Sequence, residues 1–136
     1  MDVIEVEWPP MVAAGFPSPA EDYYTGPVSL DRNLIRNPAS TFVLRVSGDS
    51  MIEAGISDGD EVLVDRSLTP GDGDVVVAVL HDEFTLKRLR LRPPRLEPAN
   101  PEFPVIPVPR DGEGFDVWGV VTTVIHHLKP GGARGR

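Results

Sequence analysis

The sequence of 136 residues contains no cysteine. That absence excludes disulfide bonds, thiol catalysis and metal sites with cysteine ligands, and it is compatible with a reducing compartment. The longest apolar run, residues 75–80, is too short to cross a membrane. The N-terminal residues are acidic and lack a basic segment before a long apolar stretch, so we expect no signal peptide. These features predict a cytoplasmic protein without membrane contact.

Basic residues are also scarce, with 13 Lys and Arg against 21 Asp and Glu and a formal net charge of −8. An acidic surface repels phosphate, so we expect no direct, sequence-specific binding of DNA. The glycine patterns that hold nucleotide phosphates are missing, and Asp-Gly-Asp at 58–60 and 72–74 fits tight turns better than calcium loops. His81, His126 and His127 lack a metal-ligand spacing. We therefore expect neither a cofactor nor a metal.

Proline and glycine, by contrast, are abundant, with 15 and 13 residues. Proline breaks helices and glycine weakens them, so the chain favours short strands and turns over long helices. Residues 1–40, which prolines interrupt repeatedly, predict an extended N-terminal arm, with a short helix or turn at 31–36 for which Asp31 is a candidate N-cap. Residues 41–128 predict a mostly β domain, and residues 129–136 a disordered tail.

Five segments within the predicted β domain have the composition of strands. They are residues 41–46, 61–65, 75–80, 84–91 and 115–126. Residues 51–56 predict one helical turn, residues 70–74 a tight turn, and residues 81–83 the tip of a hairpin. Gly119 marks a bend in the last strand. The proline-rich stretch 93–109 has only weak patterning.

Lys87 lies where the apolar pattern of its strand changes phase. Side chains alternate between the two faces of a strand, so a regular strand places Lys87 on one face with Leu89 and Leu91. A bulge near Lys87 would instead let the apolar residues on both sides of it face inward together. A buried lysine has a lowered pKa and can act as a general base, whereas a lysine whose ammonium reaches water has no such role.

Ser50 follows a predicted strand and a glycine-containing turn, and it precedes the predicted helical turn. Such a position can expose a hydroxyl group beside unpaired backbone N–H groups, which are able to stabilise an oxyanion. A serine at the same place can equally be a simple helix N-cap. The pattern alone leaves both interpretations open.

Four segments, in the order in which that family has them, resemble the LexA/UmuD-type serine peptidases. V-S-G-D-S-M at 46–51, continued by G-I-S-D-G-D at 55–60, resembles the nucleophile motif of that family. F-T-L-K-R-L at 84–89 is similar to its lysine strand, with Lys87 37 residues after Ser50. A-G-F-P-S-P-A at 14–20 resembles the self-cleavage region, and F-D-V-W-G-V-V at 115–121 the closing strand. The resemblance covers roughly residues 13–128.

The resemblance implies a LexA/UmuD-type β-fold and an autocatalytic serine endopeptidase with a Ser–Lys dyad. Ser50 would be the nucleophile and Lys87 the base, with the backbone N–H groups of Ser50 and Met51 as oxyanion donors. The cleavage site would be the bond between Ala14 and Gly15, in the chain's own arm. The Ala-Gly pair is LexA-like, while the sequence around it is UmuD-like.

Repressors of this family carry a helix-turn-helix domain before the peptidase domain, and the roughly 40 proline-broken residues here leave no room for one. The resemblance therefore implies the UmuD branch. It further implies a homodimer, cleavage promoted by a RecA filament on single-stranded DNA, and a role in SOS mutagenesis beside a UmuC-like subunit of an error-prone translesion polymerase. The alternatives are a non-cleaving interaction module of the same fold and a peptidase that cuts a separate repressor in trans.

Overall fold

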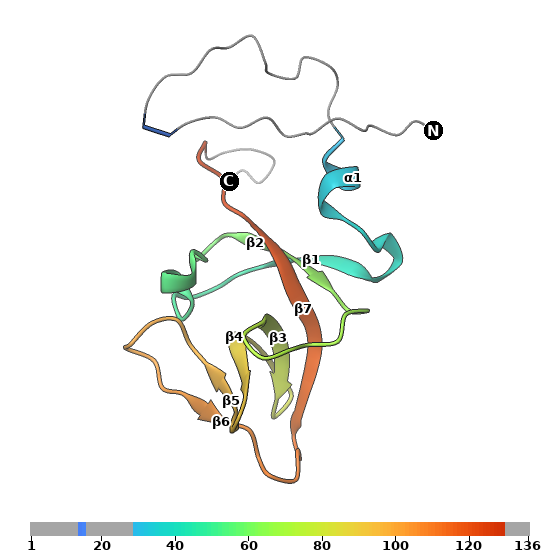
Figure 1. The fold of residues 1–136 in the computed structure, drawn as a ribbon. Helices are drawn as coiled ribbons and strands as arrows, with labels where there is room; N and C mark the ends of the chain where they lie inside the picture. Colours follow the sequence, from blue (N-terminus) through green and yellow to red (C-terminus); the bar gives the residue numbers. More distant parts are fainter. Residues whose placement is uncertain (1–13, 16–28, 130–136) are drawn as a thin grey trace. The chain divides into compact units, whose positions relative to one another are not determined.

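The computed structural model describes residues 14–15 and 29–129. The chain divides between Leu30 and Asp31 into two units, and the second unit contains nearly all of the regular structure (Figure 1). The second unit begins at Asp31, whereas the sequence predicted that the β domain begins at residue 41; that predicted boundary stays a prediction. Residues 130–136 of the predicted tail lie outside the described residues. None of the helices in the described ranges has the length and apolar character needed to cross a membrane.

The described residues form one short α-helix, two 3-10 turns and seven strands. In chain order these are α1 (Leu30–Leu34), η1 (Pro38–Ser40), β1 (Thr41–Arg45), η2 (Ile52–Ala54), β2 (Glu61–Asp65), β3 (Val75–Leu80), β4 (Glu83–Leu91), β5 (Pro94–Glu97), β6 (Ile106–Pro107) and β7 (Phe115–Ile125). The prediction of a mostly β fold is thus confirmed. Asp31 lies inside the first turn of α1, so its prediction as the N-cap is wrong.

The strands form one antiparallel sheet in the order β1-β2-β7-β3-β4-β5-β6. The last strand, β7, lies between β2 and β3 and pairs with both, so it joins the two halves of the domain (Figure 1). The hairpin of β3 and β4 turns at His81 and Asp82, which both have positive φ as such tight turns require. β7 thus holds β2 and β3 together, and these two strands in turn pair with β1 and β4.

Two strands were not predicted, β5 and β6, both within the proline-rich stretch 93–109. Pro94 is the first residue of β5, and Pro107 lies in β6 at the edge of the sheet. Proline is tolerated at these two kinds of position because neither requires a backbone donor to a neighbouring central strand. The weak patterning of the stretch therefore concealed two short strands.

Gly119 lies next to an irregularity of β7. The register between β3 and β7 shifts so that Val77 opposes Gly119 and Ala78 opposes Val117, which leaves Trp118 as the extra residue of a bulge. A Cβ on Gly119 would lie 2.5 Å from Cγ1 of Val64 in β2. The strand therefore departs from regularity at Gly119 as expected, and the glycine allows β2 and β7 to approach closely.

Two apolar clusters stabilise the sheet, one on each face, because neighbouring residues of β3 alternate between them. The first contains Met51, Ile56, Val62, Val64 and Val77, and the second Val76, Ala78, Leu89, Leu96 and Val120. Met51 directly follows Ser50 and is 2% exposed. The first cluster thus anchors the segment that carries the candidate nucleophile.

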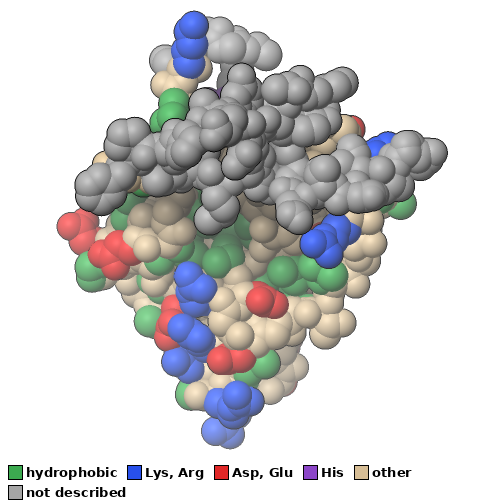
Figure 2. Space-filling model, turned by 45° about the horizontal axis from the view of Figure 1, so that its top comes forward, with side chains coloured by type: hydrophobic (Ala, Val, Ile, Leu, Met, Phe, Trp, Pro, Cys, Tyr) green, Lys and Arg blue, Asp and Glu red, His purple; other side chains and the backbone are tan. Residues whose placement is uncertain are grey.

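On the face that Figure 2 shows, basic side chains lie close to acidic ones. On β4 and β5, Arg90 pairs with Glu97 at 3.1 Å, and Arg95 pairs with the same carboxylate at 3.0 Å. Carboxylates therefore offset part of the positive charge that these neighbouring arginines contribute.

Candidate active site

The segment between β1 and η2 carries Ser50 and is fixed by the turn at residues 57–60. The amide of Val46 donates to the carbonyl of Asp60, and the amide of Gly59 donates back to Val46, each at 2.8 Å. The amide of Gly48 donates to the carboxylate of Asp58 at 2.7 Å. Gly48 has φ +94°, a conformation that favours glycine. Asp-Gly-Asp at 58–60 therefore belongs to a turn that holds the Ser50 loop.

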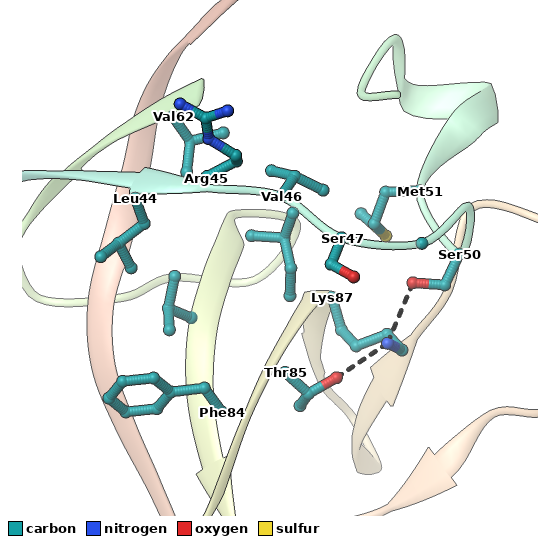
Figure 3. Close-up of a pocket in the computed structure, with 13 residues that line it drawn as sticks. Leu44, Arg45, Val46, Ser47, Ser50, Met51, Val62, Phe84, Thr85 and Lys87 are labelled. Carbon is teal, nitrogen blue, oxygen red and sulfur yellow. Dashed lines mark hydrogen bonds between the residues drawn. The ribbon is translucent and has the colours of Figure 1, made fainter. Parts of the chain in front are cut away.

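Ser50 and Lys87 lie side by side although 37 residues separate them in sequence (Figure 3). Nζ of Lys87 donates to Oγ of Ser50 at 3.1 Å and to Oγ1 of Thr85 at 2.8 Å. Ser50 comes from the loop after β1, and Lys87 comes from the middle of β4. The structure therefore brings the two predicted catalytic residues into direct contact, within the distance that proton transfer requires.

The side chain of Lys87 is buried, with only 8% of the residue exposed. β4 pairs in unbroken register with both β3 and β5, so of the two alternatives for this strand the regular one holds and the bulge near Lys87 is ruled out. Thr85, Lys87 and Leu89 share one face of that strand. Leu91, at 38% exposed, is partly open to solvent, unlike Leu89 at 4%, so it adds less to the burial than its place in the pattern suggests.

Burial lowers the pKa of Lys87 below its ordinary value because the charged amine loses solvation. An unperturbed lysine, with a pKa of about 10.4, is neutral in about one molecule in a few thousand at pH 7. A lowered pKa increases the neutral fraction, which alone can accept a proton from a hydroxyl group. The site therefore has the electrostatics of a general base.

A pocket of about 320 Å³ opens beside this pair (Figure 3). Its walls combine the polar groups of Ser50, Lys87 and Thr85 with apolar side chains from β1, β2, β3 and β4: Leu44, Val62, Val77, Phe84 and Leu86. Such a lining suits an extended peptide that presents a carbonyl group to the hydroxyl of Ser50 and small apolar side chains to the walls.

Ser50 and Met51, whose amides are expected as oxyanion donors, both line the same pocket. Within the described part of the chain, neither amide donates a hydrogen bond to another residue. Backbone N–H groups that are free of internal partners can bind a developing negative charge. Their geometry is thus compatible with the expected role, which stays a prediction.

Ala14 and Gly15 are exposed and form a bend in the first unit. The rest of the expected arm, residues 1–13 and 16–28, lies outside the described residues. The assignment of the bond between Ala14 and Gly15 as the cleavage site therefore stays a prediction.

The histidines at the end of β7 pair with carboxylates. Nδ1 of His126 lies 2.5 Å from the carboxylate of the buried Asp60, and Nε2 of His127 lies 2.9 Å from Glu61. No group of three potential metal ligands occurs in the ranges that the structure describes. These histidines join the end of β7 to the start of β2.

Thr85 is a site residue that the sequence analysis did not single out. Its Oγ1 accepts a hydrogen bond from Lys87 within the same strand. The period of two along β4 offered a signal, because a residue two positions before Lys87 must lie on the same face.

Comparisons with known proteins agree with the geometry. The profile of the Peptidase S24-like family matches residues 4–122. The chain is 50% identical to protein MucA of Salmonella typhimurium over 118 residues, which cover 85% of this chain and 81% of MucA. It is 49% identical to protein ImpA of Shigella flexneri over 119 residues, 85% of this chain and 79% of ImpA.

A repressor is also similar. The LexA repressor of Sorangium cellulosum is 39% identical over 130 residues, which cover 93% of this chain but only 56% of the repressor. The family match and the long alignments to MucA and ImpA each cover most of the chain. The chain therefore belongs to the Peptidase S24-like family, as a UmuD-like member of the LexA/UmuD serine peptidases.

Proposed function

We propose that the chain is a self-cleaving endopeptidase that hydrolyses its own bond between Ala14 and Gly15. The observation that carries the proposal is the contact of 3.1 Å between Oγ of Ser50 and the buried amine of Lys87. The chain's membership of a serine peptidase family supports the same assignment. Ala14 and Gly15 are small, so a nucleophile can approach the carbonyl group between them closely.

The proposed reaction has two stages. Neutral Lys87 takes the proton of the Ser50 hydroxyl while Oγ attacks the carbonyl carbon of Ala14, and the amides of Ser50 and Met51 stabilise the oxyanion. The bond to the nitrogen of Gly15 then breaks, and Lys87 returns the proton to the leaving amine. Water attacks the ester on Ser50 with Lys87 again as base, and the proton finally returns to Oγ.

We place this cleavage in SOS mutagenesis. The similarity to MucA and ImpA and the UmuD-like character of the chain support this context. In the proposal a RecA filament on single-stranded DNA promotes docking of the arm, and the shortened chain, as a homodimer, serves as accessory subunit of an error-prone translesion polymerase. Loss of residues 1–14 removes Asp2, Glu5 and Glu7 but no Lys or Arg, which changes the formal charge from −8 to −5.

The test follows the fragments of the purified chain by mass spectrometry at alkaline pH. Wild type is expected to yield a fragment that begins at Gly15, and Ser50→Ala and Lys87→Ala are expected to stay intact. The matched control is Lys129→Ala, which changes the only other lysine of the sequence. This control should cleave like wild type.

The same experiment distinguishes the alternatives. A chain that stays intact at every pH, with or without RecA filaments, contradicts the proposal and favours an interaction module. Cleavage of the Ser50→Ala chain by added wild type, at a rate proportional to wild-type concentration, shows that the site acts between molecules. A fragment beginning at Gly15 from either dyad variant alone contradicts the dyad.

A further inference from the structure

The connection between β5 and β6 contacts the Ser50 loop through residues 98–101, which we call the strap. Two prolines, Pro98 and Pro101, restrict its backbone, and the second one also restricts Asn100 to extended conformations. The amide of Glu102 and the amide of Phe103 both donate to Asn100, to its side-chain oxygen at 2.9 Å and its carbonyl at 3.1 Å. The strap is therefore a short segment with little conformational freedom.

Three hydrogen bonds join the strap to the Ser50 loop and to η2, which directly follows it. The amide of Ala99 donates to the carbonyl of Ser50 at 2.7 Å, and the carbonyl of Ala99 accepts from Glu53 at 2.8 Å. Nδ2 of Asn100 donates to the carbonyl of Asp49 at 2.9 Å. The strap thus binds the carbonyl groups on both sides of the nucleophile.

Those two carbonyls belong to the peptide units that contain the proposed oxyanion donors. In a trans peptide the C=O and N–H groups point in opposite directions within one plane. Both peptide bonds are trans, since the cis bond of the described chain lies between Arg92 and Pro93. A bond to the carbonyl of Asp49 therefore fixes the N–H of Ser50, and a bond to the carbonyl of Ser50 fixes the N–H of Met51.

We propose that Asn100 is a positioning residue for the oxyanion site, and that the strap aims both N–H groups into the pocket. This inference rests on the proposed function. The amide of Ile52 also donates to the carbonyl of Asp49, but at 3.3 Å, so Asn100 makes the shorter contact. Preorganised donors lower a barrier only while their direction is held, and a small misplacement can reduce a rate by up to about a hundredfold.

Two substitutions separate this role from a role in the turn. Asn100→Asp keeps the oxygen that accepts from Glu102 but loses the donor to Asp49, and Asn100→Ala loses both without adding a charge. The control is Asn37→Ala, which removes an amide that donates to Asp65 at 2.7 Å, outside the pocket that holds Ser50. Wild type and these three variants are purified as full-length chains, and thermal unfolding compares their stability.

The readout is the first-order rate of self-cleavage between pH 6 and 11, with Ser50→Ala as the inactive reference. We expect both Asn100 variants to lose roughly tenfold or more of the plateau rate, and we expect the Asn100→Ala profile to keep the wild-type midpoint, because the base is unchanged. Asn37→Ala should keep the plateau rate.

Three results overturn the inference while the proposed function stands: Asn100→Asp at the wild-type plateau, a rate loss in Asn37→Ala as large as in the Asn100 variants, or a shifted midpoint in Asn100→Ala. If wild type does not cleave, or Ser50→Ala does, the proposed function fails and the inference fails with it.

Discussion

Gly119→Ala tests whether the packing of β2 against β7 controls the stability of the fold. The added methyl group would lie 2.5 Å from Cγ1 of Val64, well inside van der Waals contact. Val64 is fully buried and packs within the first apolar cluster, and the short, branched side chain of a valine has little freedom to move aside. The backbone of β2 or β7 must therefore shift, and the shift distorts the hydrogen bonds between these two strands near the bulge.

The magnitude follows from two opposing contributions. Overpacking a core typically costs about 1–3 kcal/mol, and replacing glycine within a strand returns roughly 0.5–1 kcal/mol of backbone entropy. We expect a net decrease of up to about 2.5 kcal/mol in the free energy of unfolding, with about 1 kcal/mol at the middle of these ranges. In a domain of this size, each kcal/mol corresponds to a decrease of about 4–8 °C in Tm.

Urea unfolding and thermal unfolding of the full chain with Ser50→Ala, which removes the proposed nucleophile, provide the measurement. The matched control is Gly71→Ala, where the new methyl group meets only Oδ2 of Asp74 at 3.7 Å, an ordinary contact. That control should remain within about 0.5 kcal/mol of the parent. A Gly119→Ala chain with the urea midpoint of the parent would refute the reasoning, since it would show that the close approach is not enforced.

Three further predictions concern titratable and hydrogen-bonding groups. Because burial lowers the pKa of Lys87, the self-cleavage rate should rise with pH and reach its plateau with a midpoint below 10.5, and a midpoint at or above that value would contradict the effect of burial. Thr85→Val removes the acceptor that orients this amine, and a net hydrogen bond of about 0.5–1.5 kcal/mol predicts up to a tenfold slower cleavage by the same assay. Hydrogen bonds from Asn37 and Ser67 lower the pKa of Asp65 from 3.8 to about 2, so this carboxylate stabilises the fold fully above pH 3.8 and progressively less as the pH falls toward 2. In urea unfolding, Asp65→Asn should therefore lower the free energy of unfolding at pH 7 and lower it much less at pH 2.5. An equal decrease at both pH values would contradict the proposed dependence of stability on the charge of Asp65.

Local composition predicted the strands that consist of β-branched residues between turn signals. Residues 61–65 and 75–80 are rich in valine and each follows an Asp-Gly-Asp turn, and the structure places β2 and β3 at those residues. β5 and β6 were not predicted because each contains a proline, and a proline is compatible with a strand only at its first residue or at the edge of a sheet. The position of a strand within the sheet cannot be read from the propensities of its residues.

The candidate site divides in a similar way. The phase change at Lys87 pointed to an unusual lysine, but composition could not choose between a regular strand and a bulge; pairing of β4 with two neighbours settles the choice. Asn100 gave no signal at all, because its contact with Asp49 spans 51 residues and depends on where the β5–β6 connection crosses the loop. Short motifs therefore locate reactive groups, while the residues that orient them emerge only from the fold.

On the proposed function, this architecture places the control of cleavage in the arm and not in the dyad. Ser50 and Lys87 are already in hydrogen-bond contact, and the loop that carries Ser50 is held on one side by the 57–60 turn and on the other by the strap. A rigid site of this kind gains little from rearrangement, because its donors and its base are in place before a substrate arrives. The slow event must then be the arrival of a carbonyl group at Ser50. A promoter of cleavage would therefore act by raising the fraction of chains whose arm occupies the pocket, and it would leave the pH midpoint set by Lys87 unchanged.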